Sequence, residues 1–411
     1  MSEFEKIIVF TEAYIMTENL INRFLNYVAI DTQSDEESTT SPSTMKQHDL
    51  AGLLVSELVE LGAEDVVYDR DYCNVYAKLR GEGEPLGFVS HMDTSPAASG
   101  ANIRPRIIEN YQGGDPLLRE DHFPELAEHR GETLIATDGT TLLGADDKAG
   151  VAEIMNMIQY YSEHPEIRHR TISVAFTSDE EIGHGTLHFN TDLFGVREAY
   201  TVDGGKLGVL EYECFNAASA EVKIKGRSVH PGYAKDKMIN AIYVAMEFNG
   251  FLPAIERPEH TEMYEGFFML STMEGGVDEA RMKYIIRDHD RGIFEMRKAL
   301  FWRIATYLNE KYGEGTITLD IRDTYYNMAE VMKDHMDMID RVKEKFAKLG
   351  VNCVTLPIRG GTDGAALSFK GIPCPNLCTG GYNFHGRYEY ASVQEMEKCA
   401  ELLISLVKID D

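Results

Sequence analysis

Apolar positions in the first half of the chain recur with two different periodicities. Some segments carry apolar residues at helical spacing, and short β-rich runs lie between them. The predicted helices cover residues 17–30, 45–62, 149–164 and a segment near 187–194, and the predicted strands cover residues 74–81, 85–93, 171–181 and 198–205. Strands that alternate with helices predict an α/β fold, with a mainly parallel sheet flanked by helices.

The pattern changes at about Glu213. The predicted strands now cover residues 215–226, 266–276, 279–290 and 316–326, with helices over 234–252 and 291–313. We interpret this part as a smaller α+β domain of four strands and two helices, inserted into the larger one. Helices over 335–350 and 392–409 then resume the first pattern. The expected domains are an N-terminal extension (1–15), a larger domain (16–212 and 328–411) and the inserted domain (213–327).

The composition narrows the classes of partner. With 40 basic and 68 acidic side chains among 411 residues, the formal charge is −28, which disfavours nucleic acid and anionic membrane surfaces. The six cysteines are too sparse for a disulfide framework, and no apolar stretch approaches the roughly 18 residues of a membrane span. The amino terminus lacks the basic region and cleavage site of a signal peptide. We therefore expect a cytoplasmic protein with a small or cationic partner.

The segment FTSDEEIGHG, residues 176–185, places three carboxylates in a row directly after an apolar strand. These are Asp179, Glu180 and Glu181. Like charges at the end of a buried strand repel one another unless water solvates them or a cation neutralises them. A solvated turn is the ordinary explanation for such a triplet, and a solvated or turn-forming role is the default for Asp179, whose role the sequence leaves open.

Histidine or carboxylate side chains follow most of the predicted strands. Ligands of an open α/β sheet gather at the carboxyl ends of its strands, so these positions are informative. They hold His91 and Asp93, Asp146 and Asp147 before a helix, Glu180 and Glu181, Asp203, and His385 in a glycine-rich segment. Each residue alone has a structural explanation, as a hydrogen-bonded histidine, a helix cap or a turn residue. Their joint occurrence at one edge of one sheet indicates a ligand site.

The chemistry of this set indicates metal ions. Two histidines with several carboxylates, and no thiolate, suit zinc, cobalt or manganese in a catalytic site. More than four such ligands indicate two ions, which two-metal hydrolases hold about 3.5–4 Å apart. Two divalent cations would also let the clustered carboxylates stay ionised.

Several motifs, in order from about Glu18 to the C-terminus, resemble those of the di-zinc M20 metallopeptidase family. They are SHMDTSP, LLGADDKAG, FTSDEEIG, YTVDGG, VHPG, YIIRD, PIRGGTDGA, PCPNL and TGGYNFHG. ENYQGGDP and PIRGGTDGA are similar to the tripeptide aminopeptidase branch of that family rather than to its deacylases or carboxypeptidases. The resemblance implies a zinc-exopeptidase-like catalytic domain, and an inserted domain that acts as a lid and pairs two chains into a homodimer.

The resemblance also implies a role for each site residue. It assigns His91, Asp146 and Asp203 to one zinc, and Asp146, Glu181 and His385 to the other. Asp146 rather than Asp147 is the implied bridge, because the family's bridging carboxylate lies two residues before the lysine that is Lys148 here. Asp93 matches the carboxylate that orients the first histidine. Tyr388 occupies a position where some members have a further histidine.

The implied reaction is release of the N-terminal residue from a tripeptide. Two Zn²⁺ per subunit, with Co²⁺ or Mn²⁺ as substitutes, would activate a water molecule, and Glu180 matches the general base. His230 in VHPG matches a histidine that supports the oxyanion, often from the partner subunit. Arg287 and Arg359 are our candidates for binding the tripeptide carboxylate, because a guanidinium grips a carboxylate bidentately. Residues on two domains would then require the domains to close over the substrate.

Two other classes of function stay open on the sequence alone. A two-metal site would also serve an amidohydrolase or deacylase of N-acyl amino acids, with a phosphoesterase as a weaker alternative. A non-catalytic peptide-binding relative is a further hypothesis, although such a protein would be expected to lose Glu180 or a ligand, and every one of these positions is filled. A requirement for a free amino group separates an aminopeptidase from a deacylase.

Overall fold

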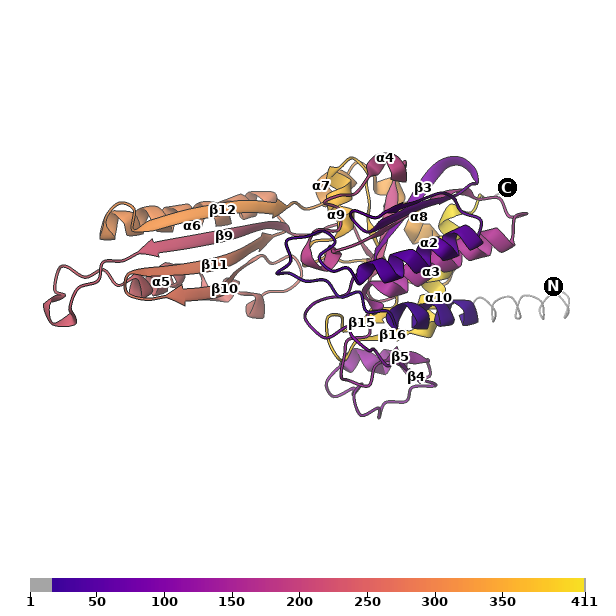
Figure 1. Ribbon diagram of the computed structural model, residues 1–411, viewed down its shortest axis with the longest axis horizontal. Helices are drawn as coiled ribbons and strands as arrows, with labels where there is room; N and C mark the ends of the chain where they lie inside the picture. Colours follow the sequence, from indigo (N-terminus) through magenta and orange to yellow (C-terminus); the bar gives the residue numbers. More distant parts are fainter. Residues whose placement is uncertain (1–16, 410–411) are drawn as a thin grey trace. The chain divides into compact units, whose positions relative to one another are not determined.

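The computed structural model describes residues 17–409, and these divide into two compact units (Figure 1). The larger unit comprises the described residues up to Tyr212, Val331–Thr355, and those from Thr362 onward. The smaller unit comprises Glu213–Glu330 and Leu356–Gly361. The segment 1–15, expected as an N-terminal extension, lies outside the described residues.

An eight-stranded mixed sheet lies at the centre of the larger unit, in the order β1-β2-β6-β3-β7-β14-β8-β13. Its strands are β1 (Glu64–Asp69), β2 (Asn74–Leu79), β3 (Glu82–His91), β6 (Arg170–Thr177), β7 (Ala199–Gly204), β8 (Val209–Glu211), β13 (Val354–Thr355) and β14 (Asn376–Cys378). The central pairs β6–β3, β3–β7 and β7–β14 are parallel, whereas β1–β2, β2–β6 and β14–β8 are antiparallel. The predicted α/β fold is confirmed, with parallel pairing at the centre of the sheet and antiparallel pairs beside it.

Helices cover both faces of this sheet, which explains why its central strands β3 and β6 are buried over most of their length. The helices of this unit are α2 (Gln47–Glu60), α3 (Ala145–Glu163), α4 (Thr191–Phe194), α8 (Met336–Lys348), α9 (Asp363–Phe369) and α10 (Val393–Val407), with a further helical segment over 17–28. α3 packs on β3 and β7, and α10 packs on both α3 and α8. Phe194 of α4 and Leu367 of α9 join Val89 and Ala175 of the sheet in one buried cluster.

A second, small sheet in the larger unit was not predicted. It is antiparallel, in the order β15-β16-β5-β4. Its strands are β4 (Arg106–Ile108), β5 (Leu134–Ala136), β15 (Gly381–Tyr382) and β16 (Tyr390–Ser392). Runs of two or three residues are too short to show a period of two, so periodicity could not detect them.

The smaller unit is an antiparallel sheet in the order β10-β11-β9-β12, packed against two helices (Figure 1). Its elements are β9 (Asn216–Lys225), α5 (Ala241–Gly250), β10 (Phe267–Gly275), β11 (Glu279–Asp288), α6 (Arg291–Tyr312) and β12 (Ile317–Tyr325). Along β9, Ala220, Val222 and Ile224 are buried beneath the helices, while Lys223 and Lys225 between and after them are exposed. The prediction of four strands and two helices is confirmed.

Two details of this part differ from the sequence-based expectation. The helix expected over 234–252 begins only at Ala241, because the Asn240 side chain accepts a hydrogen bond from the Ile242 N–H (3.0 Å) and caps the helix there. The short segment 356–361, which we expected in the larger domain, belongs to the smaller unit. A parallel bridge between Cys214 and Ile358 holds it there. The short helix α7 (Ala329–Met332) crosses the second boundary.

Candidate metal centre

The carboxyl ends of three parallel strands carry most of the predicted ligands. His91 is the last residue of β3, and Asp203 is the next-to-last residue of β7. Glu180 and Glu181 follow β6 and form a single turn, the 3₁₀ helix η2 (Glu180–Ile182). Because β6, β3 and β7 are adjacent in the sheet, their ends bring these residues together.

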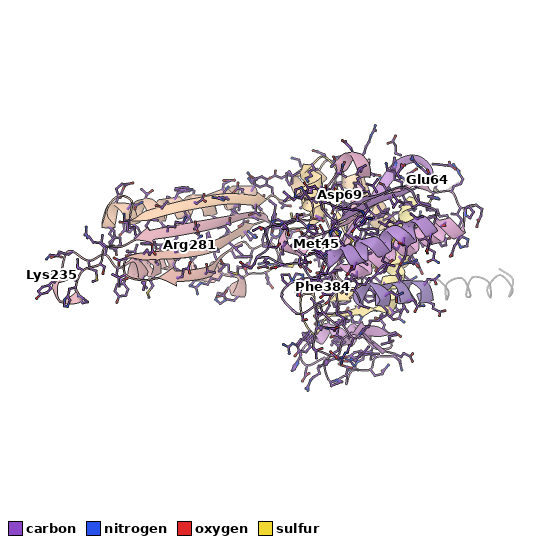
Figure 2. All side chains as sticks on the ribbon, in the orientation of Figure 1. Met45, Glu64, Asp69, Lys235, Arg281 and Phe384 are labelled. Atoms are coloured by element: carbon purple, nitrogen blue, oxygen red, sulfur yellow. The ribbon has the colours of Figure 1, made fainter. Side chains whose placement is uncertain are left out.

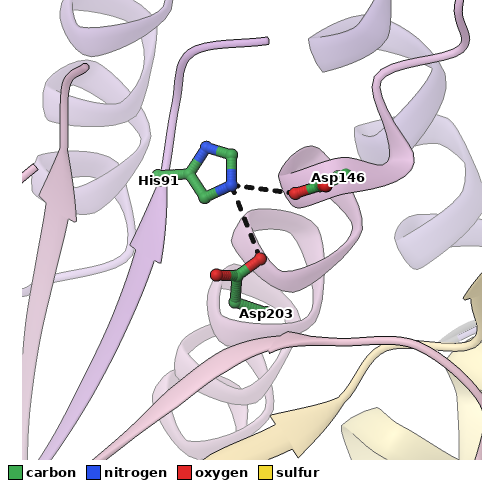
Figure 3. A group of neighbouring side chains, drawn as sticks. All are labelled: His91, Asp146 and Asp203. Carbon is green, nitrogen blue, oxygen red and sulfur yellow. Dashed lines mark hydrogen bonds and ion pairs between the residues drawn. The ribbon is translucent and has the colours of Figure 1, made fainter. Parts of the chain in front are cut away.

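The first group of possible ligands consists of His91, Asp146 and Asp203, whose ligand atoms lie within 4.8 Å of one another (Figure 3). Nε2 of His91 is 2.9 Å from Oδ1 of Asp146 and 3.5 Å from Oδ1 of Asp203. On the other side of the ring, Nδ1 lies 3.0 Å from the carbonyl oxygen of Asp93 and 3.4 Å from its carboxylate. Asp93 therefore fixes the imidazole with Nε2 toward the two carboxylates.

The second group consists of Asp146, Glu181 and His385, and it shares Asp146 with the first. Nε2 of His385 is 3.0 Å from Oδ2 of Asp146 and 3.0 Å from Oε2 of Glu181. Asp146 thus turns one oxygen toward His91 and the other toward His385. Oε1 of Glu181 is buried and has no hydrogen-bond partner among the described residues.

The carboxylates around the two histidines raise the pKa of each imidazole. Burial alone would lower the pKa of His91, but Asp203, Asp146 and Asp93 raise it well above its ordinary value. Hydrogen bonds to Asp146 and Glu181 raise the pKa of His385 to about 11. Burial would raise the pKa of Asp146, but the two histidines lower it below the ordinary range. Divalent cations bound here would replace the imidazole protons as partners of these carboxylates.

Asp93 also fixes the turn that carries Glu180. Its two carboxylate oxygens accept hydrogen bonds from the N–H of Glu180 (3.0 Å) and of Glu181 (3.2 Å). Burial raises the pKa of Glu180 well above its ordinary value, and the negative charges of Asp203, Asp363 and Glu181 add to this. A carboxyl group with a raised pKa beside a cluster of ligands is suited to proton transfer near neutral pH.

Asp147 belongs to neither ligand group. Its carboxylate accepts hydrogen bonds from the Ser90 hydroxyl and from the His91 N–H (3.2 Å). It therefore ties the start of α3 to the end of β3.

Asp179 is not solvated, so that part of the expectation was wrong, but it does lie in the turn between β6 and η2. It is fully buried, and its carboxylate accepts hydrogen bonds from the N–H (2.7 Å) and hydroxyl (2.5 Å) of Ser43 and from Nε2 of Gln47 (2.6 Å). The positive φ of Asp179 (60°) places its side chain away from the metal ligands that follow it. Its charge is balanced by three donors rather than by water.

Two further buried carboxylates beside the site escaped the sequence analysis. Asp363, in the segment GGTDG, accepts a hydrogen bond from the Thr177 hydroxyl (2.8 Å), and burial raises its pKa to about 6. Glu389 accepts three backbone hydrogen bonds from the segment that leads to Asp146, and burial raises its pKa to about 7. The only signal for Glu389 in the sequence is its place four residues after His385.

A third group of possible ligands, His129, Glu132 and Glu395, lies in the same unit. Nδ1 of His129 is 2.8 Å from Oε2 of Glu132, which also accepts from the Ser392 hydroxyl (2.7 Å). Glu395 accepts from the Tyr382 hydroxyl (2.7 Å). These internal partners satisfy the group, and we interpret it as a polar network that supports the small sheet.

The remaining predicted residues, His230, Arg287 and Arg359, all lie in the smaller unit. His230 is exposed in the loop between β9 and α5, which includes the 3₁₀ helix η3 (Pro231–Tyr233) and, at its outer end, Lys235 (Figure 2). Arg287 lies at the end of β11, partly buried, with its guanidinium 5.3 Å from the centre of the Tyr325 ring.

The two arginines differ in how their guanidinium groups are used. Arg359 donates to the carbonyl oxygens of Met263 (2.7 Å) and Glu265 (3.0 Å) and to the Thr261 hydroxyl (2.9 Å). Arg287 donates from Nη1 to the backbone oxygens of Ala218 (3.3 Å) and Ile286 (3.0 Å) and also interacts with the Tyr325 hydroxyl, and no carboxylate pairs with it among residues 17–409. Burial lowers its pKa, so an anionic partner would be favourable there.

The fold and the ligand groups define a class of protein, the M20 peptidases. A family model described as the peptidase dimerisation domain (M20_dimer) matches residues 212–316. Two solved structures show the same fold over 95% of this chain and 98% of theirs. One is the aminopeptidase PepT of Bacillus cereus (TM-score 0.76, 23% identity), and the other is a tripeptidase of Staphylococcus aureus (TM-score 0.78, 22% identity).

A relative with higher sequence identity gives the particular family. The chain is 52% identical over 406 residues to peptidase T of Geobacillus kaustophilus, and the match covers 96% of this chain and 98% of that protein. The chain therefore belongs to the peptidase T family. Among the described residues, no helix is both long and apolar enough to cross a membrane.

Proposed function

We propose that this chain is a di-zinc aminopeptidase that releases the N-terminal residue of tripeptides. The observation that carries the proposal is the shared position of Asp146, whose two oxygens face two different histidines. A carboxylate in this position suits a ligand that bridges two metal ions. The family of the chain and the names of its relatives support the same conclusion.

The residues fit a pair of metal ions. His91, Asp146 and Asp203 would hold one ion, and Asp146, Glu181 and His385 the other. This set of nitrogen and oxygen ligands without thiolate is typical of catalytic zinc, with cobalt or manganese as substitutes. The buried and unpartnered Oε1 of Glu181 needs a cation, because an unsatisfied buried carboxylate oxygen is costly.

Glu180 is the proposed general base. Bound zinc lowers the pKa of a water molecule toward neutrality and polarises a carbonyl group. Glu180 would take the proton from the attacking water and then deliver it to the leaving amine. The hydrogen bond from its N–H to Asp93 fixes its backbone, while its carboxylate accepts no hydrogen bond from residues 17–409. Its carboxylate therefore stays available to the reacting groups.

Two residues of the smaller unit are proposed to act on the substrate. Nδ1 of His230 accepts a hydrogen bond from the Gly232 N–H (3.2 Å), which leaves Nε2 as the donor toward a developing oxyanion. Arg287 is proposed to bind the C-terminal carboxylate, since its guanidinium has no anionic partner among the described residues. Binding of the C-terminal carboxylate by Arg359 stays a prediction. Its guanidinium already donates to Met263, Glu265 and Thr261, which does not favour that role.

The smaller unit is also proposed to pair two copies of the chain. Large apolar side chains are exposed on its helices: Tyr243 and Met246 on α5, and Met296 and Trp302 on α6. The match to the peptidase dimerisation domain covers both helices. We expect light scattering to find a dimer that Trp302→Glu converts to monomer, and a parent chain that is monomeric at micromolar concentration would contradict this.

We also propose that the enzyme acts in the cytoplasm. All six of its cysteines are free thiols, as expected in a reducing compartment.

One assay tests the proposed activity. The chain, loaded with Zn²⁺ or Co²⁺, is incubated with a dipeptide, a tripeptide, a tetrapeptide and an N-acetylated tripeptide of the same residues. We expect rapid release of the N-terminal residue from the tripeptide and none from its N-acetylated form. Faster hydrolysis of the N-acetylated substrate would instead support a deacylase.

A further inference from the structure

Glu389 joins two segments of the larger unit that are far apart in the sequence. It is 1% exposed and directly precedes β16. Its Oε2 accepts hydrogen bonds from the N–H groups of Leu143 (2.7 Å) and Gly144 (2.8 Å), and its Oε1 accepts from the N–H of Asp146 (3.0 Å). One carboxylate thus satisfies three N–H groups of the segment that leads into α3.

These three N–H groups form a concave site for an anion. Gly144 has a left-handed conformation (φ 80°), which turns successive N–H groups toward the same side. Two oxygens at the spacing of a carboxylate reach all three donors. An amide of the same shape would present an NH₂ group, a donor, to at least one of them. The arrangement is therefore specific for a carboxylate.

The same residue ends the loop that carries His385. This loop, residues 383–389, connects β15 to β16. The His385 side chain is 49% exposed, and it contacts the carboxylates of Asp146 and Glu181. A half-exposed histidine on a surface loop has little packing to hold it, so its position depends on how the loop is anchored. Glu389 anchors the loop directly to the segment of Asp146.

We propose that Glu389 is a positioning residue that holds the His385 loop against the Asp146 segment and thereby sets the affinity of the second metal ion. The inference rests on the proposed metal pair, and it does not depend on the substrate. His91 and Asp203 end their own strands, so the first ion keeps two ligands that Glu389 does not position. The effect of losing Glu389 should therefore be unequal between the two ions.

The test compares Zn²⁺ binding by the metal-free full-length chain and its Glu389→Gln variant, using calorimetry and competition with a chelator. We expect the affinity for the second ion, the one held by Asp146, Glu181 and His385, to fall about 10- to 100-fold, the usual effect of removing an outer partner of a ligand. The first ion should change by less than about threefold. His385→Ala identifies which binding step belongs to the second group.

A matched control is Glu57→Gln. Glu57 also joins two elements, because it accepts from Nε of Arg23 (2.8 Å) and from the Tyr27 hydroxyl (2.8 Å), but it touches neither ligand segment. It should leave both affinities unchanged. Thermal unfolding of the metal-free proteins shows whether each variant is folded. If Glu389→Gln does not fold, Glu389→Asp, which keeps the charge but is shorter, is measured in its place with the same criteria.

Two results would overturn the inference: unchanged affinity for both ions, or an equal loss for both together with a lower melting temperature. A parent chain that binds a single ion would overturn both this inference and the proposed metal pair. A parent chain that binds two ions but does not cleave tripeptides would refute the proposed activity and leave the role of Glu389 standing.

Discussion

At the scale of single residues, three adjacent carboxylates have three different surroundings. Asp179 is buried among hydrogen-bond donors, Glu181 lies 3.0 Å from His385, and Glu180 is held through its N–H by Asp93. These three carboxylates are therefore adjacent in the sequence but do not form one acidic patch in the structure. Their roles differ because the backbone turns between them, with Asp179 in a left-handed conformation (φ 60°) and Glu180 beginning a 3₁₀ turn.

This separation predicts the outcome of Glu180→Ala. The variant should retain both metal ions, because Glu180 is in neither ligand group, and should lose about 10²- to 10⁴-fold in kcat, the usual contribution of a general base. Elemental analysis gives the metal content, and tripeptide hydrolysis gives kcat. Glu181→Ala is the comparison, since it should lose metal as well as activity. A fully active Glu180→Ala enzyme would refute the assignment.

Glu153 on α3 is a buried carboxyl group that the proposed reaction does not use. Neither of its oxygens has a hydrogen-bond partner among the described residues. Burial raises its pKa well above the ordinary value, and the nearby Cys378 and Asp147 add to this. In the folded chain Glu153 therefore keeps its proton at pH values where the unfolded chain releases it, so folding loses stability as the pH rises above the unfolded pKa.

Glu153→Gln should remove this pH dependence, because glutamine does not titrate. The free energy of unfolding of the variant should therefore exceed that of the parent by an amount that grows with pH. The growth should be up to about 1.4 kcal/mol per pH unit, starting at the pKa of Glu153 in the unfolded chain, about 4.3, and ending at its pKa in the folded chain. Urea unfolding of both metal-free proteins at pH 5, 6, 7 and 8 measures the difference. A difference that stays constant over this range would show that Glu153 titrates alike in the two states.

At the scale of elements, the sequence patterns predicted the features that are set by residues close together in the chain, namely the longer strands and the ligand candidates at their ends. The strands β3, β6 and β7 are apolar runs, and the ligand candidates follow from the rule that α/β sheets bind ligands at strand ends. The small sheet was missed because its strands have two or three residues. Glu389 and Asp363 were missed because their partners lie far away in the chain, more than 180 residues in both cases. The periodicity of apolar residues carries no information about hydrogen bonds between such distant positions, so they cannot be predicted from one sequence.

Asp179 joins two elements, and this gives a prediction at their scale. Asp179→Ala should destabilise the metal-free chain by about 2–3 kcal/mol, since it removes the charge-assisted hydrogen bonds from the Ser43 N–H and hydroxyl and from the Gln47 side chain. Urea unfolding measures the loss. Ser43→Ala keeps the carboxylate and removes the hydroxyl, which donates to Asp179 and accepts from the Asp35 N–H (3.0 Å), and it should cost less, about 1 kcal/mol. Equal losses in the two variants would mean that the carboxylate does not act as the common acceptor.

At the scale of the whole molecule, the chain contains two units with separate cores and different residues for the proposed reaction. The larger unit holds both ligand groups and Glu180, and the smaller unit holds His230, Arg287 and Arg359. With a net charge of −28, the chain has many more carboxylates than cationic side chains, so a cation without a carboxylate partner is unexpected. The guanidinium of Arg287 pairs with no carboxylate of the described residues even though the chain is so acidic, and it is therefore a strong candidate for binding an external anion.

Replacing Arg287 tests this argument for the whole chain. Arg287→Met should raise KM for a free tripeptide by about 10- to 100-fold, the cost of a lost charged hydrogen-bond pair, and should leave KM for the C-terminally amidated peptide nearly unchanged. Arg359→Met is the matched control: its guanidinium binds the loop 261–265, so its loss should lower the melting temperature while KM for both peptides stays near the parent value. If Arg287→Met raises KM equally for both peptides, Arg287 does not recognise the carboxylate. If Arg359→Met discriminates between the two peptides and Arg287→Met does not, the roles of the two arginines are reversed.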